Sequence, residues 1–294
     1  MPRFFLQFGP GFSLDGLFDS QPQEAFLHDI AGLPDTPTLD SHVPRFLYGM
    51  VRGVPVLAAD GHRHISEGNG LLPCLIPLAT AWKIGAKRQI FVDSGISLRQ
   101  EIKMGHWMLL VDTINGFTFS PTDGHHHLFE NTYPDMTQTF SQRQNSELMN
   151  ALAAAGISPK LGIYMGRPGF HTSTHAETAI AQNSGADILG HELVLEVMFA
   201  YALGAEVSAF ALATSQWNKA SSSRFSRKEA LETCRQCSPD FIRGLAKAIH
   251  ELDQPVVDFV PLPESQADEI LSKPVIPKEQ RRSPLRAFLP KYED

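Results

Sequence analysis

The sequence predicts an α/β fold, built around a mixed or parallel sheet. Short apolar runs alternate along the chain with longer segments of helical pattern, which is the order of elements that α/β domains show. The apolar runs are mostly unbroken, as expected of strands that are buried on both faces. With 43% hydrophobic and 19% charged residues in 294, the composition is that of an ordinary folded protein with an ample core.

Each expected element follows from these patterns. In chain order, the strand candidates are the mostly apolar runs at 3–9, 45–51, 54–59, 88–94, 106–112, 159–166, 186–190 and 206–214. The helix candidates lie between or after them, at 71–85, 141–156, 172–185, 191–204 and 226–253. Most of these helices end at a glycine, the residue that best adopts the left-handed conformation closing a helix.

The end of the chain differs from the rest. From about residue 254 the sequence is rich in proline and shows little periodicity. We therefore expect one α/β domain over 1–253 and an extended Pro-rich tail over 254–294. No interior linker or repeat interrupts the first segment.

Charge and composition exclude several classes of protein. The net charge is −7 with both signs interspersed, which leaves no basic surface for nucleic acid or an anionic membrane. The longest near-apolar run, 71–82, is too short to span a membrane, and the first residues lack the pattern of a signal peptide. Cys234 and Cys237 have C-x-x-C spacing but fall inside the expected helix 226–253, so they are interpreted as ordinary helix residues. We expect a cytoplasmic protein.

The segment "DGHRHISEGN" (60–69) is the first candidate site, because it places two histidines and a carboxylate after the strand at 54–59. Such a cluster could bind a metal, hold an anion, transfer protons or simply form a loop. Sites in α/β folds usually lie in loops beyond the carboxyl ends of strands. His62, Asp93, Gly166 and Thr214 all occupy that kind of position.

Five blocks of sequence, in order, resemble the trimeric purine nucleoside phosphorylase family. "DGHRHISEG" resembles G-R-x-H-x-Y-E-G, "FVDSGISL" with "MGHWMLLVDTIN" resembles V-T-N-A-A-G-G-L with V-G-D-x-M-x-I-x-D-H-I-N, and "LFENTYPDM" resembles R-F-G-x-R-F-P-x-M. "GRPGFHTSTHAE" and "GADILGHELVLEV" resemble G-P-x-F-E-T-x-A-E and G-A-D-x-x-G-M-S-T-x-P-E-V. The resemblance implies a distorted mixed central sheet flanked by helices, assembly as a homotrimer, and cleavage of a nucleoside N-glycosidic bond by phosphate, the pentosyltransferase chemistry of purine metabolism.

Carried over residue by residue, the resemblance implies an altered phosphate site. The family's first serine falls on Pro10, its arginine on His62 and its later serine on Glu192, while its histidine is kept as His64. A carboxylate about 4 Å from a unit negative charge repels it by about 4 kcal/mol at an effective dielectric near 20. Phosphate is therefore a doubtful co-substrate, and no other cofactor is expected.

The base and sugar positions have changed as well. The family's glutamate and asparagine at the base fall on His171 and Ser215. At the sugar, the family's tyrosine, methionine and late histidine fall on Ser66, His191 and Arg227. The remaining expected substrate-binding residues are Glu67, Asp93, Ser94, Phe170 and Phe129, the last of which fits the aromatic that family members donate across the trimer interface.

Histidines also raise the question of a metal. The imidazoles expected near Glu192 could bind a transition metal, but their spacing does not support it, and we expect none. "GHHHLFE" (124–130) is better interpreted as a loop over the pocket, because adjacent histidines cannot all face one ion.

Three functional hypotheses remain. In the first, the protein is a glycosyl-bond enzyme in which Glu192 or His64 activates water and His171 acts as general acid; a variant of it keeps phosphorolysis, with protonated His62 replacing arginine. In the second, the scaffold is recruited for other small-molecule chemistry in a biosynthetic pathway. In the third, it is a non-catalytic binding homologue. Fold resemblance alone does not decide among them.

Overall fold

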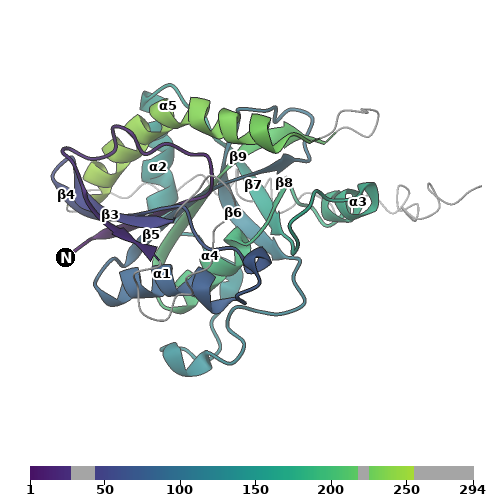
Figure 1. Cartoon of the computed structure of the whole chain (residues 1–294), viewed down its shortest axis with the longest axis horizontal. Helices are drawn as coiled ribbons and strands as arrows, with labels where there is room; N and C mark the ends of the chain where they lie inside the picture. The colour runs from purple at the N-terminus through teal and green to yellow at the C-terminus, as the bar shows by residue number, and fades with distance from the viewer. Residues whose placement is uncertain (28–43, 218–224, 255–294) are drawn as a thin grey trace, which may run out of the picture.

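The computed structural model describes residues 1–27, 44–217 and 225–254, which contain one nine-stranded mixed sheet (Figure 1). The strand order is β2-β3-β4-β1-β5-β8-β7-β6-β9, and β9 also pairs with β5. The sheet therefore curls until β9 returns to β5; the family resemblance implied a distorted sheet, but not this pairing. The strands are β1 (Phe4–Phe8), β2 (Gln23–Phe26), β3 (Arg45–Val51), β4 (Val54–Asp60), β5 (Arg88–Ser97), β6 (Trp107–Asn115), β7 (Lys160–Gly166), β8 (Ile188–Gly190) and β9 (Glu206–Gln216).

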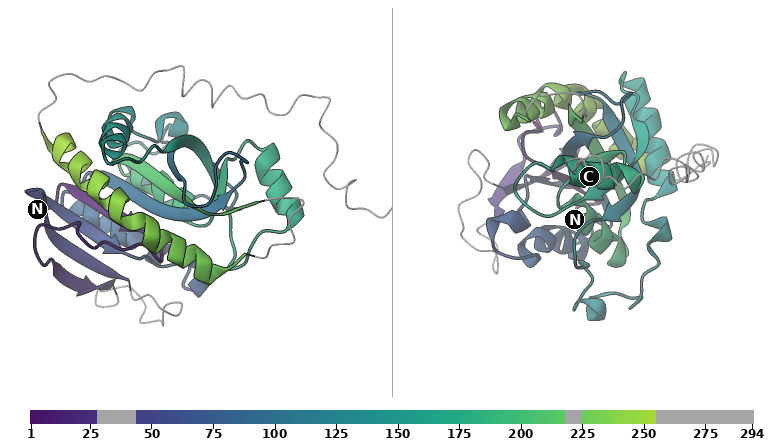
Figure 2. Two further views of the ribbon diagram at one scale, coloured as in Figure 1. Left: turned by 90° about the horizontal axis from the view of Figure 1, so that it is seen from above. Right: turned by 90° about the vertical axis from the view of Figure 1, so that its right-hand side faces the viewer.

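Helices cover both faces of this sheet, as Figures 1 and 2 show. On one face α2 packs against α5, and on the other α1 packs against α4, each pair over its own cluster of buried apolar side chains. None of the described helices is long and apolar enough to cross a membrane. The helices are α1 (Leu72–Lys83), α2 (Gln142–Ala154), α3 (His175–Asn183), α4 (Leu193–Ala202) and α5 (Arg227–Asp253), with short 3-10 turns η2 (Ile65–Glu67), η3 (His126–Leu128) and η4 (Met136–Gln138).

Local sequence signals explain where the helices begin and end. The side chains of Ser141, Thr174 and Ser226 accept hydrogen bonds from backbone N–H groups in the first turns of α2, α3 and α5. The glycines predicted to close the first four helices, Gly85, Gly156, Gly185 and Gly204, all have positive φ. Strand β2 was not predicted, because all four of its side chains are exposed and leave no apolar pattern.

Close approach of β8 to β5 positions the candidate site. A Cβ on Gly95 would lie 2.8 Å from the Leu189 carbonyl oxygen, and one on Gly190 would lie 2.0 Å from the Tyr164 hydroxyl. Glycine at 95 therefore lets the backbones of β5 and β8 approach closely, and glycine at 190 leaves room for the Tyr164 side chain. The pairing of β5 with β9 shifts register at Gly95, so β5 bends where β8 crosses it.

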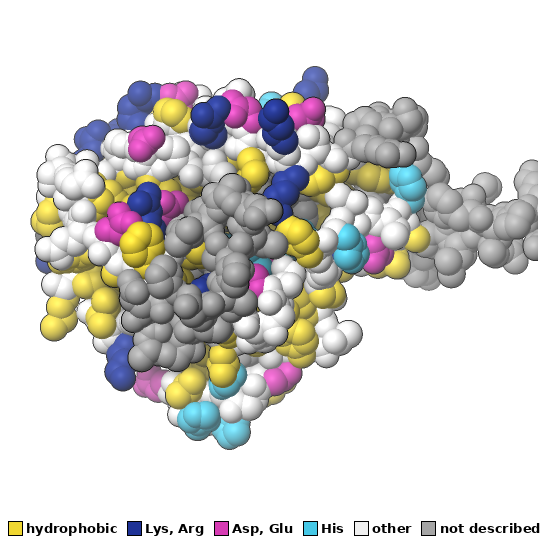
Figure 3. Space-filling view, viewed as in Figure 1, with side chains coloured by type: hydrophobic (Ala, Val, Ile, Leu, Met, Phe, Trp, Pro, Cys, Tyr) yellow, Lys and Arg dark blue, Asp and Glu magenta, His cyan; other side chains and the backbone are white. Residues whose placement is uncertain are grey.

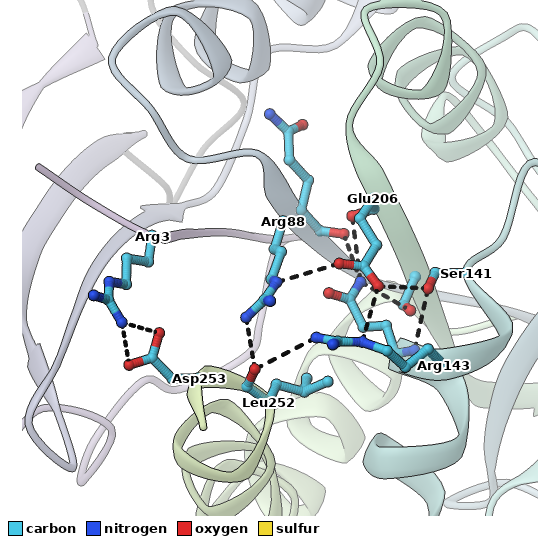
Figure 4. A network of polar contacts seen from close by, with 10 residues as sticks. Arg3, Arg88, Ser141, Arg143, Glu206, Leu252 and Asp253 are labelled. Carbon is cyan, nitrogen blue, oxygen red and sulfur yellow. Dashed lines mark hydrogen bonds and ion pairs between the residues drawn. The ribbon is translucent and has the colours of Figure 1, made fainter. Parts of the chain in front are cut away.

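Polar contacts tie the last turn of α5 to the amino-terminal ends of β5 and β9 (Figure 4). The Arg88 guanidinium donates to the Leu252 carbonyl at 2.7 Å and to the Glu206 carboxylate at 3.2 Å. Arg3 forms an ion pair with Asp253. These contacts lie at the amino-terminal ends of β5 and β9, whereas the candidate site lies toward the carboxyl-terminal ends.

On the face shown in Figure 3, basic and acidic groups are interspersed among hydrophobic ones rather than gathered in a patch of one sign. The predicted tail, 254–294, lies outside the described residues except for Gln254, so the predicted domain boundary stays a prediction.

Candidate functional site

A cavity of about 300 Å³ opens beside the carboxyl half of β5, between the β7–α3 loop, the β8–α4 turn and the start of α5. Its wall includes most of the side chains that the sequence singled out. These are His64, Ser66, Asp93, Ser94, Phe170, His171, His191, Glu192 and Arg227. Segments far apart in sequence therefore converge on one hollow of the size that small-molecule sites have.

Three other predicted residues lie beside or behind this cavity. Ser215 lines an adjacent hollow that also includes Trp217. Glu67 is turned into the wall, where its carboxylate binds buried Arg63 at 3.0 Å and accepts the His64 backbone N–H at 2.7 Å. Glu67 therefore fixes the loop that carries His64. His62 is 3% exposed and forms a different pair.

His62 is bound to a buried carboxylate that sequence reasoning did not identify. Its Nδ1 lies 2.7 Å from Oε1 of Glu196 on α4, and the two side chains are 3% and 1% exposed. Burial alone would lower the pKa of His62, but the charge and hydrogen bond of Glu196 outweigh burial and raise it to about 9. His62 is therefore protonated at neutral pH, with its charge neutralised by Glu196. It does not replace the cation of the family's arginine in the cavity.

His64 and Glu192 form a second pair, in the cavity wall itself. Nδ1 of His64 lies 3.2 Å from Oε2 of Glu192, which precedes the first turn of α4 and is 3% exposed. Burial raises the pKa of Glu192, but the His64 hydrogen bond and charge, with the charges of His191 and His62, lower it to about 2. Because an ionised carboxylate only accepts hydrogen bonds, Nδ1 of His64 carries the proton. In the neutral ring, Nε2 is then the nitrogen that can accept a proton.

Asp93 is held in the same wall by β5 and β7. Its Oδ1 accepts the Ser94 backbone N–H at 2.7 Å, and its Oδ2 accepts the hydroxyl of fully buried Tyr164 at 3.4 Å. The Tyr164 oxygen in turn accepts the His191 backbone N–H at 2.7 Å. Burial raises the pKa of Asp93 to about 6, although the charge of His62 opposes it. The carboxyl of Asp93 therefore changes charge near neutral pH.

Arg167 also lines the cavity and was missed by sequence reasoning. It follows β7 directly, and its guanidinium donates to the carbonyls of Pro168 and His171. The His171 ring Nδ1 lies 2.9 Å from the Thr172 carbonyl oxygen. The sequence did offer a signal for Arg167: it follows a predicted strand directly and lies in the block "GRPGFH", which the family resemblance had already singled out.

The structure corrects two expectations about the segment 124–130. Phe129 is 6% exposed and packs edge-on against Phe199 of its own chain at 5.5 Å, so little of it is left to present to a neighbouring subunit. Its apolar ring is buried instead in the cluster beneath α4. None of residues 124–130 lines the two hollows described above, so this segment is not a loop over the pocket.

Within 1–27, 44–217 and 225–254, no group of three or more His, Cys, Asp or Glu side chains is arranged to hold a metal ion.

Known proteins that resemble this chain over much of its length are purine nucleoside phosphorylases. Purine nucleoside phosphorylase 1 of Geobacillus stearothermophilus is 24% identical over 251 residues, covering 84% of this chain and 90% of that protein. The Mycobacterium tuberculosis purine nucleoside phosphorylase is 31% identical over 180 residues, or 60% of this chain and 63% of that protein. The crystal structure of Schistosoma mansoni purine nucleoside phosphorylase in complex with inosine matches with a TM-score of 0.77 at 21% identity, covering 86% and 92% of the two chains.

The fold and the family agree. The sheet and its helices superpose on those of a solved phosphorylase, and the family model described as "Phosphorylase superfamily" matches residues 20–250, most of the chain. This protein therefore belongs to the phosphorylase superfamily.

Proposed function

We propose that this protein cleaves the N-glycosidic bond of a nucleoside or nucleoside-like compound, with water as the nucleophile. Its relatives are named purine nucleoside phosphorylases, and one solved relative holds inosine, which supports a nucleoside as the substrate. The observation that carries the hydrolytic reaction is the His64–Glu192 pair in the cavity wall. Such a pair can take a proton from water, whereas phosphate needs no base to attack.

Electrostatics in the cavity disfavour phosphate at the position where the family binds it. Glu192 is ionised and lines the cavity, and the positive charge of His62 is neutralised by Glu196 behind the wall. Pro10 also lines the cavity and has no N–H to donate. A phosphate dianion beside Glu192 would meet a carboxylate, and the neutralised His62 would offer it no net positive charge; the repulsion costs about 4 kcal/mol per pair of unit charges 4 Å apart. Water carries no such cost.

The reaction follows from the protonation states of the wall. Nε2 of His64 accepts a proton from water as the water oxygen bonds to the anomeric carbon, and Glu192 stabilises the resulting imidazolium. The electrons of the broken carbon–nitrogen bond leave with the base, to which His171 donates a proton. Above pH 6 the ionised Asp93 adds negative charge beside the positive sugar of the transition state. The products are the free sugar and the free base.

The expected homotrimer and the cytoplasmic location rest on the family resemblance and on composition. We propose the trimer on the ground that the superfamily match spans most of the chain. Light scattering coupled to size-exclusion chromatography tests it, and a mass of one chain, 32.5 kDa, would contradict it.

The test of function is a mass-spectrometric screen of purine and pyrimidine nucleosides, with and without phosphate. We expect base release without phosphate. His64→Gln and Glu192→Gln should lower it about 100-fold or more, within the usual range for loss of a general base or of the group that orients it. His127→Gln, on the exposed turn η3, is the matched control and should release base at the wild-type rate. Release that requires phosphate, or no release from any nucleoside, would contradict the proposal.

A further inference from the structure

We propose that the cavity binds an oxyanion carried by its substrate, a phosphate or carboxylate group, through Arg167 and Arg227. This inference rests on the proposed function, since it takes the cavity to be a nucleoside site, and it specifies the substrate class. Both side chains line the cavity, Arg167 from the loop after β7 and Arg227 from the first turn of α5.

Arg167 is a buried cation without a carboxylate partner. It is 8% exposed, and burial lowers its pKa, yet a guanidinium remains charged in a protein. Its contacts are the carbonyls of Pro168 and His171 and the ring of His171; in the described part of the chain, no carboxylate lies within ion-pair distance of it. Buried charges are normally paired, because removal from water is costly. The position facing the cavity therefore suits an anion from the ligand.

The two carboxylates whose charges act on Arg167 already have other hydrogen-bond partners. Glu177 and Glu192 act on Arg167 only through their charge. Glu177 caps α3 by accepting the Thr174 backbone N–H at 2.7 Å, and Glu192 is paired with His64. Neither can turn to Arg167 without breaking its own contact.

Arg227 supplies a second cation to the same cavity. Its guanidinium lies over the ring of Phe170, 5.1 Å from the centroid, and over the described ranges no ion pair engages it. Stacking on an aromatic face leaves the edge N–H groups of a guanidinium free to donate. Guanidinium groups bind phosphate and carboxylate through paired, charge-assisted hydrogen bonds, so two of them in one wall suit an oxyanion.

The cavity wall therefore carries both signs of charge, with Asp93 and Glu192 as its acidic side chains and Arg167 and Arg227 as its basic ones. A substrate that becomes positive at the sugar and carries an oxyanion elsewhere presents a charge suited to each kind of side chain. An oxyanion attached to the nucleoside is brought to the arginines by the rest of the molecule, which raises its effective concentration there. Free phosphate has no such help and meets the same carboxylates alone.

The test is isothermal titration calorimetry with four compounds: inosine, inosine 5′-monophosphate, orotidine and inorganic phosphate. The proteins are wild type, Arg167→Gln, Arg227→Gln and the control Arg243→Gln, an exposed arginine on α5 paired with Asp240. We expect at least one oxyanion-bearing nucleoside to bind about tenfold or more tightly than inosine. Arg167→Gln and Arg227→Gln should remove most of that advantage, and Arg243→Gln should keep it.

Each outcome decides the matter. Tighter binding of inorganic phosphate alone, sensitive to Arg167→Gln, would overturn the substrate-borne anion and make the arginines a free-phosphate site. No advantage for any oxyanion, or an advantage that survives both substitutions, would overturn the oxyanion site. If circular dichroism shows that Arg167→Gln is unfolded, the exposed Arg227→Gln decides. Because the readout is binding, failure of the proposed hydrolysis in the base-release screen is distinguishable from failure here.

Discussion

The buried His62–Glu196 pair makes stability depend on pH in a direction that can be calculated. The pKa of His62 rises from 6.5 to about 9 in the folded protein, so folding favours its protonated form. The stabilisation is fully present below pH 6.5 and is lost as the pH rises through 9. A shift of this size corresponds to about 3 kcal/mol, at about 1.4 kcal/mol for each pKa unit. In Glu196→Gln the charge that most raises the pKa of His62 is absent, and burial, the largest single effect, then favours the neutral ring over the weaker charges of Asp93 and Glu192.

Urea unfolding at several pH values between 6 and 10 measures this effect. Near pH 6.5, Glu196→Gln should unfold with a free energy about 3–5 kcal/mol below that of wild type, the usual cost of breaking a buried pair. The gap should narrow by about 3 kcal/mol by pH 10, as wild type loses the proton of His62. Glu251→Gln, which removes an exposed partner of Lys247, is the control and should change little. A gap that stays constant from pH 6 to 10 would refute the reasoning.

Three further predictions concern the cavity wall. Base release should fall as the pH drops below about 6, where Asp93 becomes protonated; a pH–rate profile of Asp93→Asn that keeps the same limb would assign it to another group. Gly169 has φ +100°, and a Cβ there would lie 2.5 Å from Nε2 of His171. Gly169→Ala should therefore lower the free energy of unfolding by about 1–2 kcal/mol and slow base release. An unchanged rate of base release would remove His171 from the mechanism. Tyr164→Phe leaves the His191 backbone N–H without its acceptor and should cost about 1–3 kcal/mol in urea unfolding, whereas no loss would mean that the N–H finds another partner.

The fold was predictable because its signals are local. Unbroken apolar runs marked eight of the strands, and glycines such as Gly85 and Gly204 marked the helix ends. Strand β2 escaped because its exposed side chains carry no pattern. The resemblance implied a distorted sheet but not the return of β9 to β5, since periodicity does not specify which strands pair.

The site was predictable only in part, because pairing depends on distance in space. Family positions indicated that His64 and Glu192 share a pocket, and they do. They could not show that Glu196, 134 residues beyond His62, would neutralise it. Family positions also could not show that Phe129 turns into the core of its own chain or that Arg167 faces the cavity. Both residues lie in loops, where no periodic pattern indicates which way a side chain points.

The identity of the sugar product tests the central claim most directly. Wild-type protein is incubated in water and excess inorganic phosphate with a nucleoside that it cleaves in the base-release screen. The sugar released is then identified by mass. The ionised Glu192 and the neutralised His62 predict free sugar, with no increase in rate as phosphate is added. Sugar 1-phosphate as the main product would contradict the account and show that phosphate is bound despite these charges.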